Sequence, residues 1–155
     1  MTNCSHTHHH HDRESLIAHA RQYCEAHSLR LTPLRERVLA LIADSAGPAK
    51  AYALLDQLKQ NHDAAAPPTI YRAVDFLLEH GFIHKIESIN AFVACPHPGQ
   101  SHVAQFLLCD QCKNAIEIDS SQLPELLYGL AKAQNFSASK LVVEVHGLCS
   151  QCRLA

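Results

Sequence analysis

The sequence predicts an α+β protein in which a winged helix-turn-helix is followed by a small domain of strands and one helix. Three observations predict this. Apolar residues recur at helical spacing as far as residue 80, and from residue 82 the pattern changes to short, strand-like segments. Two Cys-x-x-Cys pairs lie in the second half, each placed after a strand-like segment.

Four helices are expected in the first half. The second opens at Thr32-Pro33, because threonine is a good N-cap and proline suits the first helical position. Gly47-Pro48 is expected to end that helix, and Gly81 is expected to end the fourth. The predicted helices span about 12–27, 32–46, 49–60 and 69–80.

Short strands are expected at 82–87 and 91–94, joined by a turn at 88–90, which gives the wing. Three more are expected at 103–108, 115–118 and 141–145. An amphipathic helix between the last two carries an apolar stripe of Leu123, Leu126, Leu127 and Leu130. We therefore divide the chain into a flexible His-rich tail (1–11), a winged helix (12–94), a hinge (95–101) and a second domain (102–155).

Composition narrows the class of protein. Hydrophobic residues make up 47% of the 155 and charged residues 18%, as in globular proteins. No apolar run is long enough for a membrane helix, and the N-terminus lacks the apolar core of a secretory signal, so we expect a cytoplasmic protein. The formal net charge of -2 means that any DNA-binding surface must come from local arrangement rather than bulk charge.

The paired cysteines give the strongest chemical signal. Cys109 and Cys112 follow one predicted strand, and Cys149 and Cys152 follow another. Two intervening residues let a tight turn direct both sulfurs at one ion, and two such turns complete a tetrahedral four-thiolate zinc site. The alternatives are a redox dithiol or thiols without a role, but a redox pair normally occurs singly and opens a helix. We expect a structural zinc.

A second set of candidate ligands lies at the boundary between the halves. It comprises His84, Cys95, His102 and Glu117. One thiolate, two imidazoles and a carboxylate suit zinc, although scattered polar residues are more often surface or core groups. Alternation with its isoleucine neighbours predicts that Glu117 faces away from the apolar side of its strand. A metal held here would set the angle between the two domains.

The fourth predicted helix has an apolar stripe and a polar face. Ile70 and Val74 belong to the stripe, whereas Tyr71 and Arg72 lie outside it near the helix N-terminus. Such residues are well placed for a major groove, where arginine binds guanine bidentately. The alternative is a solvated face with an incidental arginine, but the helix-turn-helix pattern and the following wing favour DNA reading.

Taken in order, these motifs resemble the ferric uptake regulator superfamily, and they look most similar to its zinc uptake regulator branch. The motifs that carry the resemblance are Arg30-Leu-Thr-Pro-Leu-Arg35, Ala51-Tyr-Ala-Leu-Leu55, Pro68-Thr-Ile-Tyr-Arg72, Gly81-Phe-Ile-His84, Cys109-Asp-Gln-Cys112 and His146-Gly-Leu-Cys-Ser-Gln-Cys152. The resemblance covers about residues 13–152. The His-rich tail is not part of this pattern.

The resemblance implies a homodimer whose second domain dimerises and whose winged helix binds double-stranded operator DNA. It implies a repressor of zinc-acquisition genes that binds two Zn²⁺ per monomer. It also implies that the protein is not an enzyme, has no small-molecule substrate and does not bind a membrane. The four cysteines map onto the structural site, and His84, Cys95, His102 and Glu117 map onto the regulatory site. Tyr52, Thr69, Tyr71 and Arg72 map onto DNA-contacting positions.

Other functions stay open at this point. A sibling regulator could sense ferrous iron or peroxide, although the Cys95 sulfur favours zinc. A protein that stores or delivers zinc could use the N-terminal histidines instead. A zinc deaminase would need His-x-Glu and Pro-Cys-x-x-Cys motifs, and the sequence contains neither.

Overall fold

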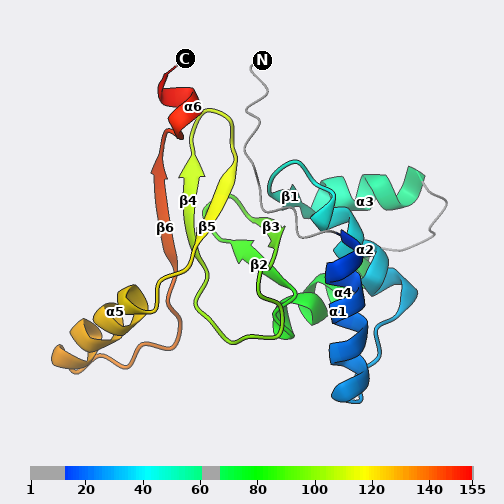
Figure 1. Cartoon of the computed structure of the whole chain (residues 1–155), viewed down its shortest axis with the longest axis horizontal. Coiled ribbons are helices and arrows are strands. Elements are labelled where there is room, and N and C mark those ends of the chain that lie inside the picture. Colours follow the sequence, from blue (N-terminus) through cyan, green and yellow to red (C-terminus); the bar gives the residue numbers. More distant parts are fainter. Residues whose placement is uncertain (1–12, 61–66, 155) are drawn as a thin grey trace. The chain divides into compact units, whose positions relative to one another are not determined.

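The computed structural model describes residues 13–60 and 67–154, which divide into two compact units between Ser101 and His102. The predicted His-rich tail lies outside the described residues. Each unit combines helices with a three-stranded sheet (Figure 1). The α+β class with an N-terminal winged helix is therefore confirmed.

The first unit contains four helices and the sheet of the wing. The helices are α1 (Arg13–Ala26), α2 (Pro33–Ala43), α3 (Ala51–Gln60) and α4 (Pro67–Glu79). The sheet has the order β1-β3-β2, with strands β1 (Ala49–Lys50), β2 (Ile83–Ile86) and β3 (Ala91–Ala94), all antiparallel. One apolar cluster joins these elements, and Val38, Leu39 and Leu77 lie at its fully buried centre.

Local chemistry explains where these helices begin and end. Thr32 caps α2, since its hydroxyl accepts from the Arg35 N–H at 3.3 Å, and Pro33 follows at the first helical position. Gly81 stops α4 with a φ of +68°, a backbone conformation that glycine adopts at little cost. Both of these sequence predictions are confirmed.

Three helix boundaries in this unit differ from the prediction by two residues or more. Helix α4 begins at Pro67 rather than at Thr69. Helix α2 ends at Ala43 rather than at Gly47-Pro48, because the Asp44 N–H already closes the last turn on Ala40 O at 2.9 Å. Helix α3 begins two residues later than expected. The two residues before it, Ala49 and Lys50, pair with β3 and form the first strand of the wing.

The second unit is a sheet of order β5-β4-β6 with two helices. Its elements are β4 (Gln105–Cys109), β5 (Ala115–Ile118), α5 (Gln122–Ala133), β6 (Val143–Gly147) and α6 (Ser150–Arg153). Strand β4 is antiparallel to β5 and parallel to β6. The pairing partners set the strand limits, so β4 and β6 each start about two residues later than the apolar runs suggested.

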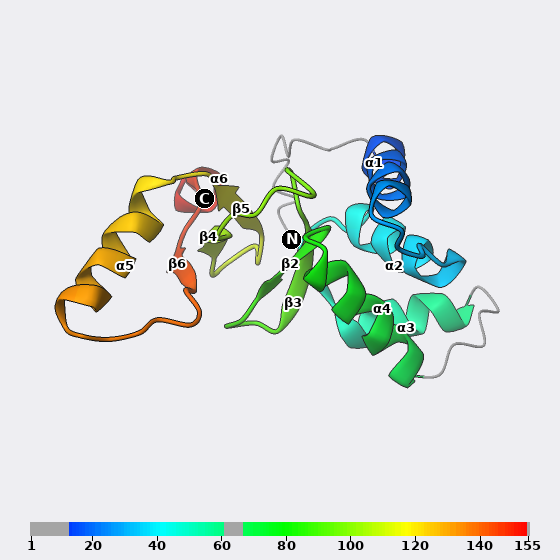
Figure 2. The same ribbon diagram turned by 90° about the horizontal axis from the view of Figure 1, so that it is seen from below.

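Helix α5 has no buried residue, and within its own unit it lies apart from the strands (Figure 2). The predicted leucine stripe is present, but Leu126 and Leu130 are more than half exposed.

One face of the sheet is also apolar and open, since Leu107 pairs with Ile116 on one side and with Val145 on the other. All three side chains are at least 39% exposed. The unit as a single chain therefore leaves much of its apolar surface uncovered.

Candidate metal centres

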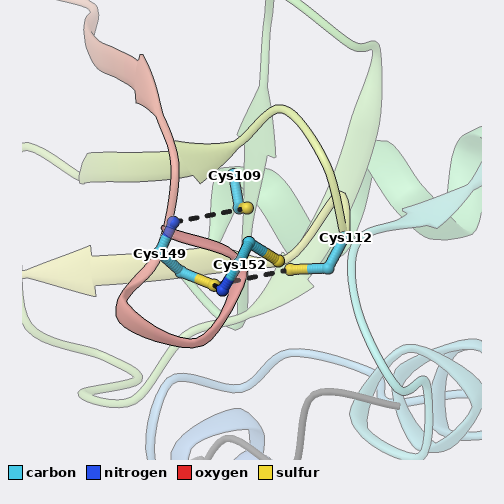
Figure 3. A group of neighbouring side chains, drawn as sticks. All are labelled: Cys109, Cys112, Cys149 and Cys152. Carbon is cyan, nitrogen blue, oxygen red and sulfur yellow. Dashed lines mark hydrogen bonds between the residues drawn. The ribbon is translucent and has the colours of Figure 1, made fainter. Parts of the chain in front are cut away.

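The four paired cysteines come together at one end of the second sheet (Figure 3). All four sulfur atoms lie within 4.8 Å of one another, and Cys112 Sγ is 3.9 Å from Cys149 Sγ. No disulfide joins them. The parallel register aligns Cys109 with Gly147, and the Asp110 N–H donates to Gly147 O at 2.8 Å. Strand pairing thus brings a pair from the middle of the chain against a pair near its end.

The two Cys-x-x-Cys pairs are built differently. Cys109 is the last residue of β4, and a turn then carries Cys112, with Lys113 at a φ of +62°. Cys149 does not end a strand as expected. It caps the short helix α6, where its sulfur accepts from the Cys152 N–H at 3.4 Å. This second pair opens a helix as redox pairs do, but its sulfurs face two further sulfurs, so a dithiol acting alone does not describe the arrangement.

Backbone N–H groups directed at sulfur prepare this cluster for a cation. The Cys149 N–H donates to Cys109 Sγ at 3.4 Å (Figure 3). This bond, together with one from the Cys112 N–H, lowers the pKa of the Cys109 thiol to about 6. Burial raises the pKa of Cys112. Four sulfurs at this spacing, one of them held toward the thiolate form, fit a tetrahedral zinc ion.

His84 and Cys95 belong to the winged unit. His84 lies on β2 opposite Val93, and Cys95 directly follows β3, where its N–H donates to Phe82 O at 3.0 Å. The Cys95 side chain is fully buried, and its sulfur accepts from the His97 N–H at 3.4 Å. The wing hairpin therefore holds a half-buried imidazole on β2 and a hydrogen-bonded sulfur directly after β3.

His102 and Glu117 belong to the second unit. His102 Nε2 is 3.1 Å from Glu117 Oε1, and the side chain of Glu117 is only 13% exposed. Glu117 lies opposite Phe106, which is buried, whereas Ile116 is 42% exposed. Glu117 therefore faces away from the open apolar face that carries Ile116, as the alternation predicts. The face that carries Glu117 is the more covered one, which the alternation does not indicate.

The residues expected to contact DNA are exposed on helices of the winged unit. Tyr52 on α3 is 64% exposed and Tyr71 on α4 is 50% exposed. Thr69 and Arg72 are also exposed on α4. Ile70 and Val74 are buried on the opposite face of the same helix. Helix α4 thus packs its apolar stripe into the core and presents its polar face to solvent.

Sequence reasoning missed two features that concern function. One is the open apolar sheet face, which simple alternation along each strand cannot show because the three strands come from distant segments. The other is the contact of Gly99 with side chains of α1. A glycine directly after Pro98 in the predicted hinge was its only signal in the sequence.

Comparison with known proteins identifies the family. A model of the ferric uptake regulator family matches residues 26–146. The chain belongs to this family. It is 40% identical over 140 residues to the zinc uptake regulation protein of Escherichia coli (strain K12), covering 90% of this chain and 82% of that protein.

Two solved structures are similar over most of the chain. The crystal structure of holo XcZur is 47% identical, covers 91% of this chain and 99% of that one, and superposes with a TM-score of 0.85. A zinc uptake regulator complexed with zinc and DNA is 39% identical, covers 92% of this chain and 96% of that one, and has a TM-score of 0.87. No helix in the described ranges is long and apolar enough to cross a bilayer.

Proposed function

We infer that the protein is a zinc-responsive transcriptional repressor that binds operator DNA as a zinc-loaded homodimer and represses genes for zinc acquisition. The observation that carries this is the similarity, over 92% of the chain, to a regulator solved with zinc and DNA. The exposed polar face of α4 in a winged helix supports it. We place the protein in the cytoplasm, where its DNA would be, and propose no enzymatic activity.

We propose that Cys109, Cys112, Cys149 and Cys152 bind a structural zinc. The sulfurs are already gathered, and the described part of this unit buries few other side chains. Bound zinc would supply strong bonds that tie the end of the chain to β4. Such a site binds too tightly to follow changes in cellular zinc, so sensing requires a second site.

We propose that His84, Cys95, His102 and Glu117 bind the second zinc, giving two per monomer. The donor chemistry supports this, since one sulfur with nitrogen and oxygen ligands favours zinc over manganese or magnesium. Each unit already holds its own pair in place. Cys95 and His102 are seven residues apart, so the segment between them spans at most about 25 Å, which is short enough for both pairs to reach one ion.

The open apolar surface of the second unit supports the homodimer. Three sheet residues (Leu107, Ile116 and Val145) and two residues of α5 (Leu126 and Leu130) expose their side chains. Exposed apolar surface of this kind on a soluble protein marks an interaction site. A two-fold dimer would bury the same face on both copies and would place two α4 helices for successive major grooves.

Zinc can act as a signal only if it binds the DNA-competent dimer better than other arrangements. Ligands contributed by both units meet this condition, because complete coordination requires one particular arrangement of the units. The coupling is reciprocal, so operator DNA should tighten binding at the second site.

The test is a Cys95→Ser variant, with Cys24→Ser as the matched control because Cys24 is also buried in the winged unit. We expect wild type and Cys24→Ser to hold two zinc ions per chain and to bind operator DNA only with zinc. Cys95→Ser should hold one zinc and lose zinc-dependent binding. Normal zinc-dependent operator binding by Cys95→Ser would overturn the assignment of the second site.

A further inference from the structure

The segment that carries Cys95 out of the wing lies against helix α1. At Gly99 the backbone has a φ of +79°, and a Cβ built there would be 3.2 Å from Tyr23 Cδ2 and 3.4 Å from His19 Nε2. Both side chains belong to α1, more than 70 residues earlier in the sequence. Any residue other than glycine would be strained and crowded at this position. The predicted hinge is therefore seated on a helix within its own unit.

Tyr23 also contacts Phe82, the residue to which the start of this segment is hydrogen-bonded. Its ring meets the Phe82 ring edge-on, with the centroids 5.3 Å apart and an interplanar angle of 88°. Phe82 is fully buried, and its carbonyl oxygen accepts the Cys95 N–H. One aromatic side chain thus borders both the residue that anchors Cys95 and the glycine four residues beyond it.

The ring of Tyr23 is itself held in place. His27 stacks on it with centroids 4.0 Å apart, and His27 Nδ1 lies 2.8 Å from Tyr23 O. Edge-on aromatic contacts such as that with Phe82 favour one ring orientation over others. The ring therefore presents a fixed surface to the segment.

The segment has little internal freedom. Pro96 and Pro98 fix two of its φ angles. The His97 N–H donates to Cys95 Sγ, and the Gln100 N–H donates to His97 O at 3.3 Å, which closes a turn around Pro98 and Gly99. Because the Cys95 sulfur is hydrogen-bonded to this restrained turn, a contact that fixes the position of the turn also fixes the direction of the sulfur.

We propose that Tyr23 is a positioning residue for the second zinc site, seating residues 95–101 on α1 so that the Cys95 sulfur is held ready to bind metal. This inference rests on the proposed ligand role of Cys95. Tyr23 acts through its contacts with the Phe82 ring and with Gly99. Residues that orient metal ligands typically change metal affinity about 10–100-fold when mutated.

The first test measures the affinity for the second zinc by competition with a chelator in the full-length protein. We expect Tyr23→Ala to weaken it by about tenfold or more. Gly99→Ala should also weaken the affinity for the second zinc, because it disturbs the same contact from the side of the segment. Tyr23→Phe keeps the ring and should restore wild-type affinity. Leu16→Ala is the control, because Leu16 is a buried residue of α1 two turns earlier. Equal affinities in wild type and Tyr23→Ala would overturn the proposal.

The second test needs no metal and separates positioning from general loosening. In zinc-free protein, the alkylation rates of Cys95 and Cys24 are compared by peptide mass spectrometry. Both cysteines are buried, and Cys24 lies on α1 itself. We expect Tyr23→Ala to raise the rate at Cys95 much more than at Cys24. An equal rise at both would show that the variant only loosens α1 and would overturn the proposal.

These measurements do not depend on DNA. A protein whose second zinc weakens in Tyr23→Ala but which never binds operator DNA would contradict the proposed function and leave the role of Tyr23 standing. If zinc-dependent operator binding is observed but Tyr23→Ala changes neither the zinc affinity nor the alkylation rates, the role proposed for Tyr23 is wrong and the proposed function stands.

Discussion

Replacing Cys149 with serine should unfold the second unit while the winged unit stays folded. Among the described residues of the second unit, Phe106 and Leu108 are the only large apolar side chains that are buried. Each contributes about 1.5–3 kcal/mol by burial, or about 3–6 kcal/mol together. A structural zinc site contributes about 10–16 kcal/mol in small domains. The cysteine cluster is therefore expected to dominate the stability of this unit.

Hydrogen exchange followed by mass spectrometry measures the two units separately. In Cys149→Ser, the amides of β4 and β6 should lose most of their protection, and those of α2 and α4 should keep theirs. Zinc content should fall by one per chain. Cys24→Ser is the control, since it removes a buried cysteine from the winged unit and should leave β4 and β6 protected. Unchanged protection of β4 and β6 in the zinc-depleted Cys149→Ser protein would show that the cysteine cluster does not dominate the stability of this unit.

Three further predictions concern DNA binding, assembly and pH. Arg72→Ala should weaken operator binding by about 1–3 kcal/mol, with the zinc content unchanged, as measured by a gel-shift titration with a parallel metal count. Leu107→Glu places a charge on the open sheet face and should give monomers in light scattering, whereas Leu154→Glu, at a position already 85% exposed, should not. Burial raises the pKa of Cys24, so its neutral form stabilises the fold below the ordinary thiol pKa, and this contribution is lost as pH rises through the raised value. The free energy of unfolding should therefore fall less between pH 8 and pH 10 in Cys24→Ala than in wild type, and equal losses would contradict this.

Local signals predicted the winged unit well. Thr32-Pro33 and Gly81 act through the backbone of their own turn, so the start of α2 and the end of α4 could be predicted from a few adjacent residues. The two-residue strand β1 could not. Ala49 and Lys50 are extended only because β3 pairs with them, and that pairing joins segments about 40 residues apart.

For the candidate ligands too, features set by adjacent residues could be predicted and features set by tertiary contacts could not. The spacing of Cys109 and Cys112 predicts a metal-binding turn by itself, and the sulfurs do gather. Spacing could not show that Cys149 opens a helix, because four residues carry too little pattern. It also could not show which face of β5 is covered, since burial of Glu117 depends on Phe106 across the sheet. The contact between Tyr23 and Gly99 is tertiary, and nothing in either local sequence specifies the other.

The central claim is that zinc controls operator binding by this protein. The most direct test is a fluorescence anisotropy titration of labelled operator DNA with the full-length protein at buffered free zinc, with ferrous iron and manganese in parallel. We expect tight binding that appears over a narrow range of free zinc and is absent with either other metal at comparable buffered concentrations. Operator binding that is independent of zinc, or that responds equally to iron, would contradict it.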